Sequence, residues 1–318
     1  MENEGICKEK TYVLKNGLCL PWISFGTGVI WKYSRHRLLF LKVNGREILS
    51  SIKHWKFNRE LKGNLGINYI LKDAYAVGFR MFDTARIYGY SEEKIGKIIS
   101  KYSDVMVTTK CSFMDLTRQG FPNNVEGNMQ ISMQELHRDK IDLYLLHWPE
   151  DNWISLYSQI IEQYKKGTCK AFGACNMEIE HLEQIRQAGL ELPMVVQTEL
   201  HPLNTKRELR EYCKVHNIQL MAHTPTARYH KYLTEHKVIK KLMNKYNKSA
   251  AQIVIRWHYQ NQIIPVVSTF DIRHMRENLQ IFDFYLQEEE QMAVENLNRD
   301  LVILCAKGID DPNYIYNK

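Results

Sequence analysis

The chain has 318 residues with a formal net charge of +7, and 44% of its residues are apolar, so it can bury a large core in one or two domains. Its seven cysteines are odd in number and scattered without a Cys-x-x-Cys pair, which argues against a disulfide framework or a zinc site, and no metal is expected. The first residues lack the basic and apolar regions of a signal peptide, and no apolar run approaches membrane-spanning length. We therefore expect a soluble cytoplasmic protein without a membrane partner.

Residues 12–20 are apolar on both sides of Asn16-Gly17, the dipeptide that most strongly favours a tight turn between two antiparallel strands. This pattern predicts a β-hairpin near the start of the chain. The apolar run at 22–25 then predicts the first strand of the main sheet, which ends at Gly26-Thr27-Gly28.

Strand-like runs recur along the chain and alternate with amphipathic segments. The eight predicted strands are 22–25, 79–83, 105–109, 141–146, 170–175, 194–198, 218–223 and 263–268. One predicted helix places four apolar residues at helical spacing, namely Leu156, Ile160, Ile161 and Tyr164. Two other helices have predicted N-caps, at Ser91 and Asp271.

Alternating strands and helices predict a parallel sheet, and eight such units predict a closed (β/α)8 TIM barrel, an α/β fold. A doubly wound nucleotide-binding fold is the alternative. It requires G-x-G-x-x-G after a strand, and residues 26–31 lack the last glycine. We therefore predict one barrel domain over residues 1–318, with an N-terminal β-hairpin and an insertion after the first strand.

The predicted insertion spans about residues 29–64 and contains nine Lys or Arg against Glu47 and Glu60. Nine minus two gives +7, which equals the net charge of the whole chain. A second Asn-Gly pair within 38–49 predicts another hairpin. The segment is interpreted either as a solvated arm or dimer contact, or as a rim that attracts an anionic substrate. Nucleic acid is a weaker alternative because no recognised binding motif accompanies the charge.

Ionisable side chains occur where three neighbouring predicted strands end. Asp83, Lys110 and His147 follow apolar runs, and Tyr88 lies in the loop after the first of these strands. Each has an ordinary interpretation by itself, such as a helix cap for the aspartate or a solvated loop position for the lysine. Because all of them fall at the carboxyl edge of one predicted sheet, together they indicate a functional site.

Six segments, in this order, resemble the aldo-keto reductase superfamily, and the resemblance covers roughly residues 10–298. They are 82–89 (FDTARIYG), 107–110 (VTTK), 142–149 (DLYLLHWP), 173–176 (GACN), 197–202 (QTELHP) and 276–279 (RENL). The chain is similar to a bacterial-type member with an enlarged, basic first βα loop. The resemblance implies a barrel closed at the bottom by the N-terminal hairpin and a nicotinamide-dependent reaction on a small carbonyl compound.

The resemblance also implies four catalytic residues. Tyr88 would exchange the proton, and the ammonium of Lys110, fixed by Asp83, would lower the pKa of a phenol that ordinarily titrates near ~10. His147 would hydrogen-bond the substrate oxygen, and Trp148 would form a wall of the substrate pocket. Gly28 stands where the family often has a bulky tryptophan, a gap that Trp31 and the insertion could fill. The tail 299–318, which contains Tyr314 and Tyr316, could fold over the mouth or be disordered.

The cofactor site that the resemblance implies is larger. Asn176 and Gln197 would hold the nicotinamide carboxamide, Cys175 replaces a usual serine, and His223 replaces an aromatic residue that stacks on the ring. The full predicted set is Gly26, Thr27, Asp83, Cys175, Asn176, Gln197, His223, Thr224, Pro225, Thr226, Ala227, Ser268, Thr269, His274, Glu277 and Asn278.

The chain departs from the family pattern where the adenosine phosphate would bind. Ser268 stands in place of a lysine, Thr269 in place of a serine and His274 in place of an arginine. Losing both cations removes most of the charge that would hold a 2′-phosphate, although Arg273 or Arg276 could compensate. NADP(H) is the family default. Because the lysine and arginine that would hold the 2′-phosphate are missing, NAD(H) is an alternative.

Two functions of different classes follow from these observations. The first is an NAD(P)-dependent reductase of an aldehyde, ketone or sugar-like carbonyl, active as a monomer or homodimer without a nucleic-acid partner. The second is a nucleotide-binding barrel of weak or no activity that acts as a sensor or partner subunit. The complete set of four catalytic residues favours the enzyme, whereas the eroded phosphate clamp favours the alternative.

Overall fold

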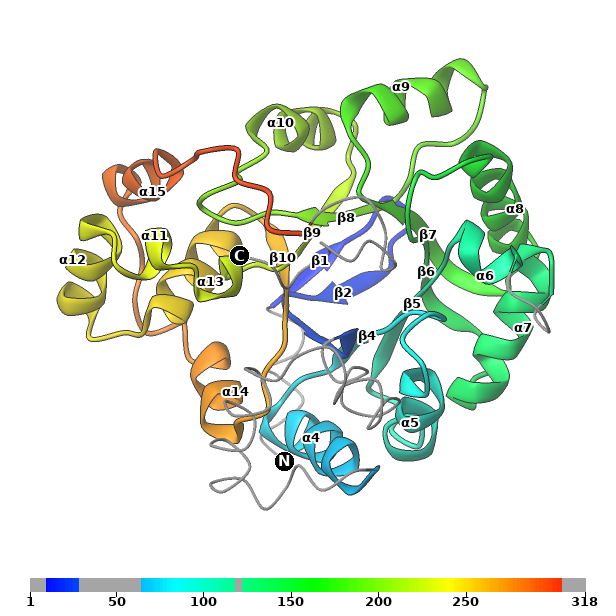
Figure 1. Cartoon of the computed structure of the whole chain (residues 1–318), viewed down its shortest axis with the longest axis horizontal. Helices are drawn as coiled ribbons and strands as arrows, with labels where there is room; N and C mark the ends of the chain where they lie inside the picture. The colour runs from blue at the N-terminus through cyan, green and yellow to red at the C-terminus, as the bar shows by residue number, and fades with distance from the viewer. Residues whose placement is uncertain (1–9, 29–63, 118–121, 305–318) are drawn as a thin grey trace, which may run out of the picture.

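The computed structural model describes residues 10–28, 64–117 and 122–304. Eight parallel strands of this part form a closed barrel in the order β10-β3-β4-β5-β6-β7-β8-β9. Figure 1 looks along the barrel, with the strands in the centre and the helices around them. The predicted (β/α)8 fold is therefore confirmed. The barrel strands are β3 Ser24–Gly26, β4 Met81–Asp83, β5 Met106–Cys111, β6 Ile141–Leu146, β7 Cys169–Cys175, β8 Val195–Glu199, β9 Gln219–His223 and β10 Ile263–Val267.

The helices lie between successive strands or, for α14 and α15, after the last one, and they cover the outside of the barrel. They are α4 Asn64–Val77, α5 Ser91–Ile98, α6 Phe113–Thr117, α7 Val125–Leu136, α8 Trp153–Lys165, α9 Ile179–Gln187, α10 Arg207–Val215, the 3-10 helix η1 Ala227–Tyr229, α11 Lys231–Thr234, α12 Lys237–Tyr246, α13 Ala250–Gln260, α14 Ile272–Leu279 and α15 Glu288–Glu295. No helix in these described stretches is long and apolar enough to cross a membrane.

The predicted N-terminal hairpin is present, with β1 Thr11–Val13 antiparallel to β2 Cys19–Pro21. Gly17 in its turn has φ +84°, a conformation that glycine adopts without steric cost. Asn16 donates to the backbone oxygen of Lys170 near the start of β7 at 2.9 Å, and Lys15 donates to that of Leu192 before β8 at 2.7 Å. The hairpin therefore lies at the end of the barrel where the strands begin.

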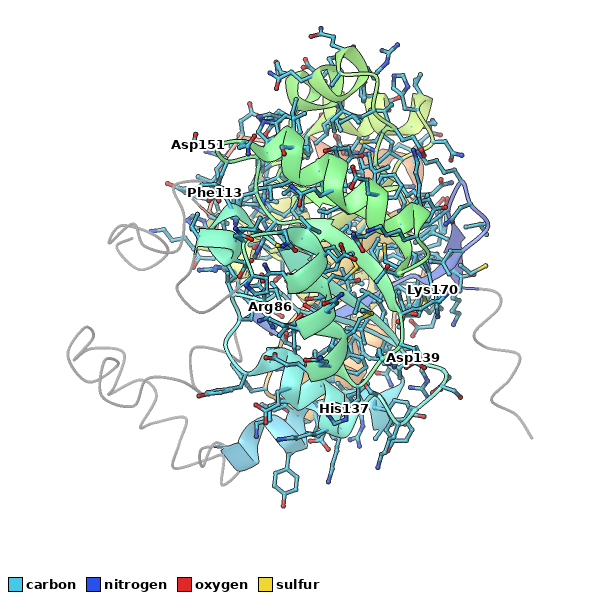
Figure 2. The ribbon with its side chains drawn as sticks, turned by 90° about the vertical axis from the view of Figure 1, so that its right-hand side faces the viewer. Arg86, Phe113, His137, Asp139, Asp151 and Lys170 are labelled. Atoms are coloured by element: carbon cyan, nitrogen blue, oxygen red, sulfur yellow. The ribbon has the colours of Figure 1, made fainter. Side chains whose placement is uncertain are left out.

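The opposite end of the barrel collects the residues that follow the strands. Figure 2 shows Arg86, Phe113 and Asp151, which follow β4, β5 and β6, toward one side of the molecule. Asp139 and Lys170, near the starts of β6 and β7, lie toward the other side. Side chains at the carboxyl ends of several strands thus share one face, as expected for a barrel of parallel strands.

The hydrophobic core lies inside the barrel and between its strands and helices. Every residue of β6 is buried, as are Leu156, Ile160 and Ile161 on one face of α8. Tyr164 completes that face, with its ring centroid 5.0 Å from that of Phe172 in β7. Fully burying one such side chain stabilises the fold by about 1.5–3 kcal/mol, so the apolar periodicity read from the sequence provides much of the driving force.

Local details correct several predictions. The first barrel strand is 24–26 rather than 22–25, and β5 continues through Lys110 to Cys111 because both residues pair with β6. Asp271 is the N-cap of α14, where its carboxylate accepts from the Arg273 N–H at 2.8 Å. The N-cap prediction for Ser91 is wrong: Tyr90 holds that position, because the Ser91 hydroxyl bonds other side chains instead.

Some predictions concern parts of the chain outside the described residues. These are the basic segment 29–63 with its hairpin at 38–49, Trp31, and the tyrosines at 314 and 316.

Candidate active site

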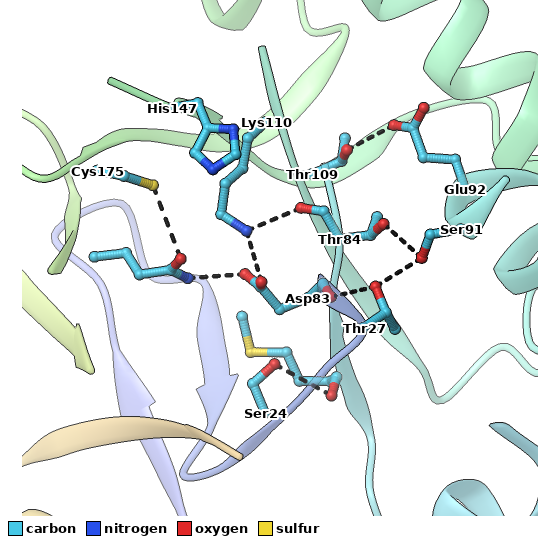
Figure 3. A network of polar contacts seen from close by, with 12 residues as sticks. Ser24, Thr27, Asp83, Thr84, Ser91, Glu92, Thr109, Lys110, His147 and Cys175 are labelled. Carbon is cyan, nitrogen blue, oxygen red and sulfur yellow. Dashed lines mark hydrogen bonds and ion pairs between the residues drawn. The ribbon is translucent and has the colours of Figure 1, made fainter. Parts of the chain in front are cut away.

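A buried ion pair forms the base of the site at the carboxyl ends of β4 and β5. The Lys110 ammonium lies 2.6 Å from Oδ1 of Asp83 and donates to the backbone oxygen of Thr84 at 2.9 Å. The second carboxylate oxygen, Oδ2, accepts from Nε2 of Gln197 at 2.8 Å (Figure 3). A buried pair is stable only when further hydrogen bonds satisfy its charges, and both carboxylate oxygens have such a partner here.

Tyr88 lies in the loop between β4 and α5, close to this ion pair. The Lys110 ammonium is 5.5 Å from the centroid of its ring, and the His147 ring meets it edge to face at 5.7 Å. Gly28 lies against the same ring: a Cβ at Gly28 would lie 3.2 Å from Cζ and 3.4 Å from the hydroxyl of Tyr88. The absence of a side chain at Gly28 therefore leaves room for the phenol.

His147 follows β6 and is buried, with its ring stacked at 5.9 Å on that of Trp148. Burial lowers its pKa well below 6.5, and the nearby Lys110 charge acts in the same direction, so the imidazole is neutral at neutral pH. Its Nδ1 is buried without a hydrogen-bond partner among the described residues. Most buried polar atoms have a partner, so this nitrogen is unusual and compatible with a site that binds a ligand.

The predicted carboxamide-binding residues meet beside the ion pair, at the ends of β7, β8 and β9. Oε1 of Gln197 accepts only a weak contact from the Cys175 thiol, at 3.9 Å, and so retains acceptor capacity for an amide N–H. Asn176 donates to the backbone oxygen of His147 at 3.1 Å, and its Oδ1 lies 2.9 Å from Nε2 of His223. Burial lowers the pKa of His223 to about 4, so its ring is also neutral at neutral pH. Oε1 of Gln197 could accept from a nicotinamide carboxamide, and the contact of Asn176 and His223 with the ring stays a prediction.

Gly26 and Thr27 are buried at the end of β3. The Thr27 hydroxyl donates to the backbone oxygen of Asp83 at 2.9 Å and accepts from Ser91 at 2.7 Å. Both contacts lie beneath the mouth of the barrel, and the cofactor contact of these two residues stays a prediction.

The remaining predicted cofactor residues follow β9 and β10 on the same face of the barrel. Thr224, Pro225, Thr226 and Ala227 form a tight loop in which Thr224 and Ala227 have φ of 54° and 50°. Ser268 and Thr269 follow β10, and His274, Glu277 and Asn278 lie on α14. Asn278 is buried, whereas Ser268 and His274 are exposed.

The two arginines that could replace the missing phosphate clamp have acidic neighbours. The Arg273 guanidinium lies 2.5 Å from the Asp271 carboxylate, with 78% of its side chain exposed. Arg276 lies near Asp73 of α4, where burial raises the pKa of the aspartate and the arginine charge lowers it. A phosphate would have to compete with these carboxylates for either arginine.

The structure contains a buried polar network near Tyr88, most of whose residues are not among the site residues predicted from the sequence. Glu92 accepts from the Thr109 hydroxyl at 2.6 Å and from Arg86 at 2.5 Å, and the hydroxyl of Ser91 links Thr84 to the end of β3 (Figure 3). One signal in the sequence was available. Glu92 shares the helical face of the buried Ile95 and Ile99, and a charge on such a face requires a buried partner.

The C-terminal part of the chain is attached at the same face. Both oxygens of Glu199, the last residue of β8, accept from backbone N–H groups, of Ile303 at 2.6 Å and of Leu304 at 2.7 Å. His201 contacts the same carboxylate at 3.0 Å. The sequence left the position of this segment open, and the structure places residues 303 and 304 at the end of the barrel where the strands end.

Comparison with known proteins shows the family of this chain. The sequence profile of the Aldo/keto reductase family matches residues 54–299. Glyoxal reductase of Bacillus subtilis (strain 168) is 32% identical over 295 residues, which cover 91% of this chain and 93% of that protein. Methylglyoxal reductase DkgA of Yersinia pestis is 35% identical over 233 residues, covering 71% of this chain and 81% of that protein.

Solved structures agree with the sequence relatives. MGS-M4, an aldo-keto reductase from a Medee basin deep-sea metagenome library, superposes with a TM-score of 0.75 at 29% identity, covering 96% of this chain and 100% of its own. A mutant of Gox0644 in complex with NADPH gives a TM-score of 0.74 at 27% identity and covers 96% and 97% of the two chains. The chain therefore belongs to the aldo/keto reductase family, and the protein is an NAD(P)-dependent oxidoreductase.

Proposed function

We propose that this enzyme reduces a small aldehyde or ketone to an alcohol, with Tyr88 as the proton donor. The observation that carries the proposal is the buried Asp83–Lys110 pair, whose ammonium lies 5.5 Å from the Tyr88 ring centroid. A free phenol has a pKa near ~10 and transfers its proton poorly at neutral pH. A neighbouring ammonium favours the phenolate and so brings this pKa closer to the working range.

The other polar groups have separate roles in this proposal. Asp83 holds the Lys110 ammonium and takes no proton itself. The neutral imidazole of His147 donates a hydrogen bond to the substrate oxygen and directs it toward Tyr88. Trp148, stacked on His147, limits the space for the substrate. Positioned acid catalysis of this kind contributes roughly 10²–10⁴-fold to the rate.

A nicotinamide dinucleotide, when bound, would supply the hydride in this reaction. Gln197 and Asn176 would hold its carboxamide, and the flat ring of His223 lies at the end of the adjacent strand. The loop at 224–227 and the residues after β10 would contact the phosphates and adenosine. The neighbour with NADPH bound supports NADP(H) as a cofactor of this chain as well.

The names of the sequence relatives favour small dicarbonyl substrates, since two of them are a glyoxal reductase and a methylglyoxal reductase. The direct test is to mix purified protein with NADPH or NADH and a panel containing glyoxal, methylglyoxal, simple aldehydes and sugars. Loss of reduced-cofactor absorbance that depends on the carbonyl supports the reductase. Cofactor binding, seen as quenched tryptophan fluorescence, without turnover of any carbonyl would instead support the non-catalytic nucleotide-binding alternative.

A first prediction concerns the choice of cofactor. Positions 268 and 274 carry a serine and a histidine, and Arg273 is paired with Asp271, so we expect NADPH to bind less than about tenfold more tightly than NADH. One charge-assisted hydrogen bond to a phosphate would already contribute about that factor. Fluorescence titration of both cofactors at low and moderate salt measures it.

Suppose instead that NADPH binds much more tightly than NADH at low salt and loses this advantage at moderate salt. That result would show that other cations hold the 2′-phosphate. In that case Arg273→Ala and Arg276→Ala, made separately, identify the arginine responsible. The variant that lacks it weakens NADPH binding and leaves NADH binding unchanged.

A second prediction concerns the basic segment, which we propose to be an insertion in a single barrel domain of a cytoplasmic monomer or homodimer. If it captures anionic substrates, neutralising Arg35, Arg37, Lys42 and Arg46 together should lower kcat/KM for an aldehyde that carries a carboxylate. The rate on a neutral aldehyde of similar size should hardly change, because an uncharged substrate is not steered by the charge of the protein.

The salt dependence of kcat/KM should flatten for the charged aldehyde alone. Equal losses on both aldehydes would mean that the segment shapes the pocket or the fold. No loss on either, with a changed sedimentation coefficient, would mean that it is a contact between subunits.

A further inference from the structure

We propose that Glu92 and Thr109 are positioning residues that hold the Tyr88 loop at a fixed separation from Lys110. This inference rests on the proposed function, because it concerns how the proton donor is kept beside the lysine that tunes it. Neither side chain lies in the predicted catalytic or cofactor set, and both are buried, with exposures of 1% for Glu92 and 0% for Thr109.

The Tyr88 loop is short and closed at its base. The Tyr88 N–H donates to the backbone oxygen of Ala85 at 2.9 Å, and the Tyr88 oxygen accepts from the Ser91 N–H at 3.2 Å. The Thr84 and Ser91 hydroxyls, at the two ends of the loop, bond each other at 2.9 Å. These contacts define the shape of the loop, but they leave its distance from β5 to other interactions.

Glu92 provides the link between the loop and β5. Its Oε2 accepts from the guanidinium of Arg86, two residues before Tyr88, at 2.5 Å. Its Oε1 accepts from the hydroxyl of Thr109, the residue before Lys110, at 2.6 Å. A parallel backbone bond runs from the Arg86 N–H to the Lys110 oxygen at 3.1 Å. One carboxylate therefore joins the segment that carries Tyr88 to the strand that carries Lys110.

Strand geometry explains how a contact at Thr109 acts on Lys110. Successive side chains of a strand point to opposite faces, so Thr109 faces the helices outside the barrel and Lys110 faces the interior. Glu92 holds the outer side chain and Asp83 holds the inner one (Figure 3). A shift of β5 relative to α5 would therefore move the Lys110 ammonium relative to the phenol.

Helix α5 has packing contacts besides those of Glu92. Its Ile95 and Ile98 are buried, and at Gly96 it approaches α7 so closely that a Cβ would lie 2.0 Å from the Glu135 backbone oxygen. The Arg86 guanidinium also lies 3.2 Å from the carboxylate of Glu135, its second acidic partner. Pairing with β4 and β6 already fixes β5 in the barrel, so the Thr109–Glu92 bond is better explained as a contact that holds the Tyr88 loop against this strand.

Thr109→Val tests this inference, because valine keeps the shape of threonine and removes the hydroxyl. The matched control is Thr108→Val in the same strand, where the buried hydroxyl has no hydrogen-bond partner among the described residues. We expect Thr109→Val to lower kcat by roughly 10- to 100-fold, the range for small misplacements of reacting groups, with the NADPH Kd unchanged. Thr108→Val and Thr109→Ser should both keep the kcat of the wild type.

The pH dependence of kcat distinguishes a positioning role from a purely structural one, because a loss of stability alone would not shift it. Lys110 and His147 are ionisable groups that contact the Tyr88 ring; His147 is neutral, and Asp83 is paired with Lys110. Moving the ammonium away raises the phenol pKa, and reduction uses the protonated phenol. The alkaline limb of kcat in Thr109→Val should therefore shift to higher pH. A crystal structure of the variant should show more than 5.5 Å between the Lys110 ammonium and the Tyr88 ring centroid.

A Thr109→Val enzyme with the kcat and pH profile of Thr108→Val overturns the inference, even if its melting temperature is lower. If Thr109→Val fails to fold, Thr109→Cys replaces it, because cysteine keeps a weaker donor in a similar volume. Thr109→Cys should change kcat and the pH profile in the same direction but by less. A Thr109→Cys enzyme with the kcat and pH profile of the wild type would overturn the inference equally. Failure of the proposed function has a different signature, namely a Tyr88→Phe enzyme that still reduces carbonyls.

Discussion

Replacing Tyr88 by phenylalanine is expected to abolish carbonyl reduction, with kcat falling by roughly 10²–10⁴-fold or more, the usual contribution of a positioned general acid. The NADPH Kd should stay nearly unchanged, because the proposed role of the hydroxyl is toward the substrate and phenylalanine keeps the ring that contacts Gly28 and His147. Steady-state kinetics with the best aldehyde of the panel, together with fluorescence titration of NADPH, measure both quantities.

Tyr90→Phe is the matched control, since it removes a phenol hydroxyl two residues further along, from a side chain that is 46% exposed. It should retain wild-type kcat. Turnover by Tyr88→Phe at a rate close to that of Tyr90→Phe would contradict the assignment of Tyr88 as the proton donor.

The second large effect is expected for Lys110→Met, which should lose both activity and stability. Without the ammonium, the Tyr88 phenol returns toward its ordinary pKa near ~10, so kcat at neutral pH falls and its alkaline limb moves to higher pH. Asp83 is left as a buried carboxylate with Gln197 as a partner. Breaking a buried ion pair by removing one member typically costs about 3–5 kcal/mol of unfolding free energy. Denaturant unfolding and the pH–rate profile measure the two losses.

The double variant Asp83→Asn with Lys110→Met separates these two roles. Removing both charges eliminates the uncompensated carboxylate, so the unfolding free energy should recover in large part while kcat stays low. Recovery of activity in the double variant, or an unshifted pH profile in an active Lys110→Met enzyme, would count against lysine as the group that tunes Tyr88.

The fold and the grouping of Asp83, Lys110 and His147 could be predicted from the sequence, because the patterns that indicate them are local. An apolar run of four to six residues between turn signals is visible in the chain itself, and the predicted run 141–146 coincides with β6. The side chains of Asp83, Lys110 and His147 fall at the carboxyl ends of such runs. Parallel strands bring those ends to one face, so their proximity followed from the alternation of strands and helices alone.

Contacts between side chains far apart in the chain were decided by the tertiary structure. Gln197 reaches Asp83 across 114 positions, and Thr109 reaches Glu92 across 17. Both contacts depend on strand register and on the closure of the barrel, which no local pattern records. Ser91 illustrates the same limit: its sequence context indicates a helix cap, yet its hydroxyl bonds Thr27, a residue 64 positions away.

The sequence by itself determined the alternating strands and helices, the family and the identity of the four candidate catalytic residues. The tertiary structure alone decided that Lys110 lies within β5, that Gly28 packs against the Tyr88 ring, and that Glu92 joins the Tyr88 loop to the lysine strand. The physical reason is the range of the interactions involved. Hydrophobic periodicity is a pattern among residues close in sequence, so it can be read from the chain. Hydrogen bonds and packing in a closed barrel join residues far apart in sequence, so they form only when the barrel has folded.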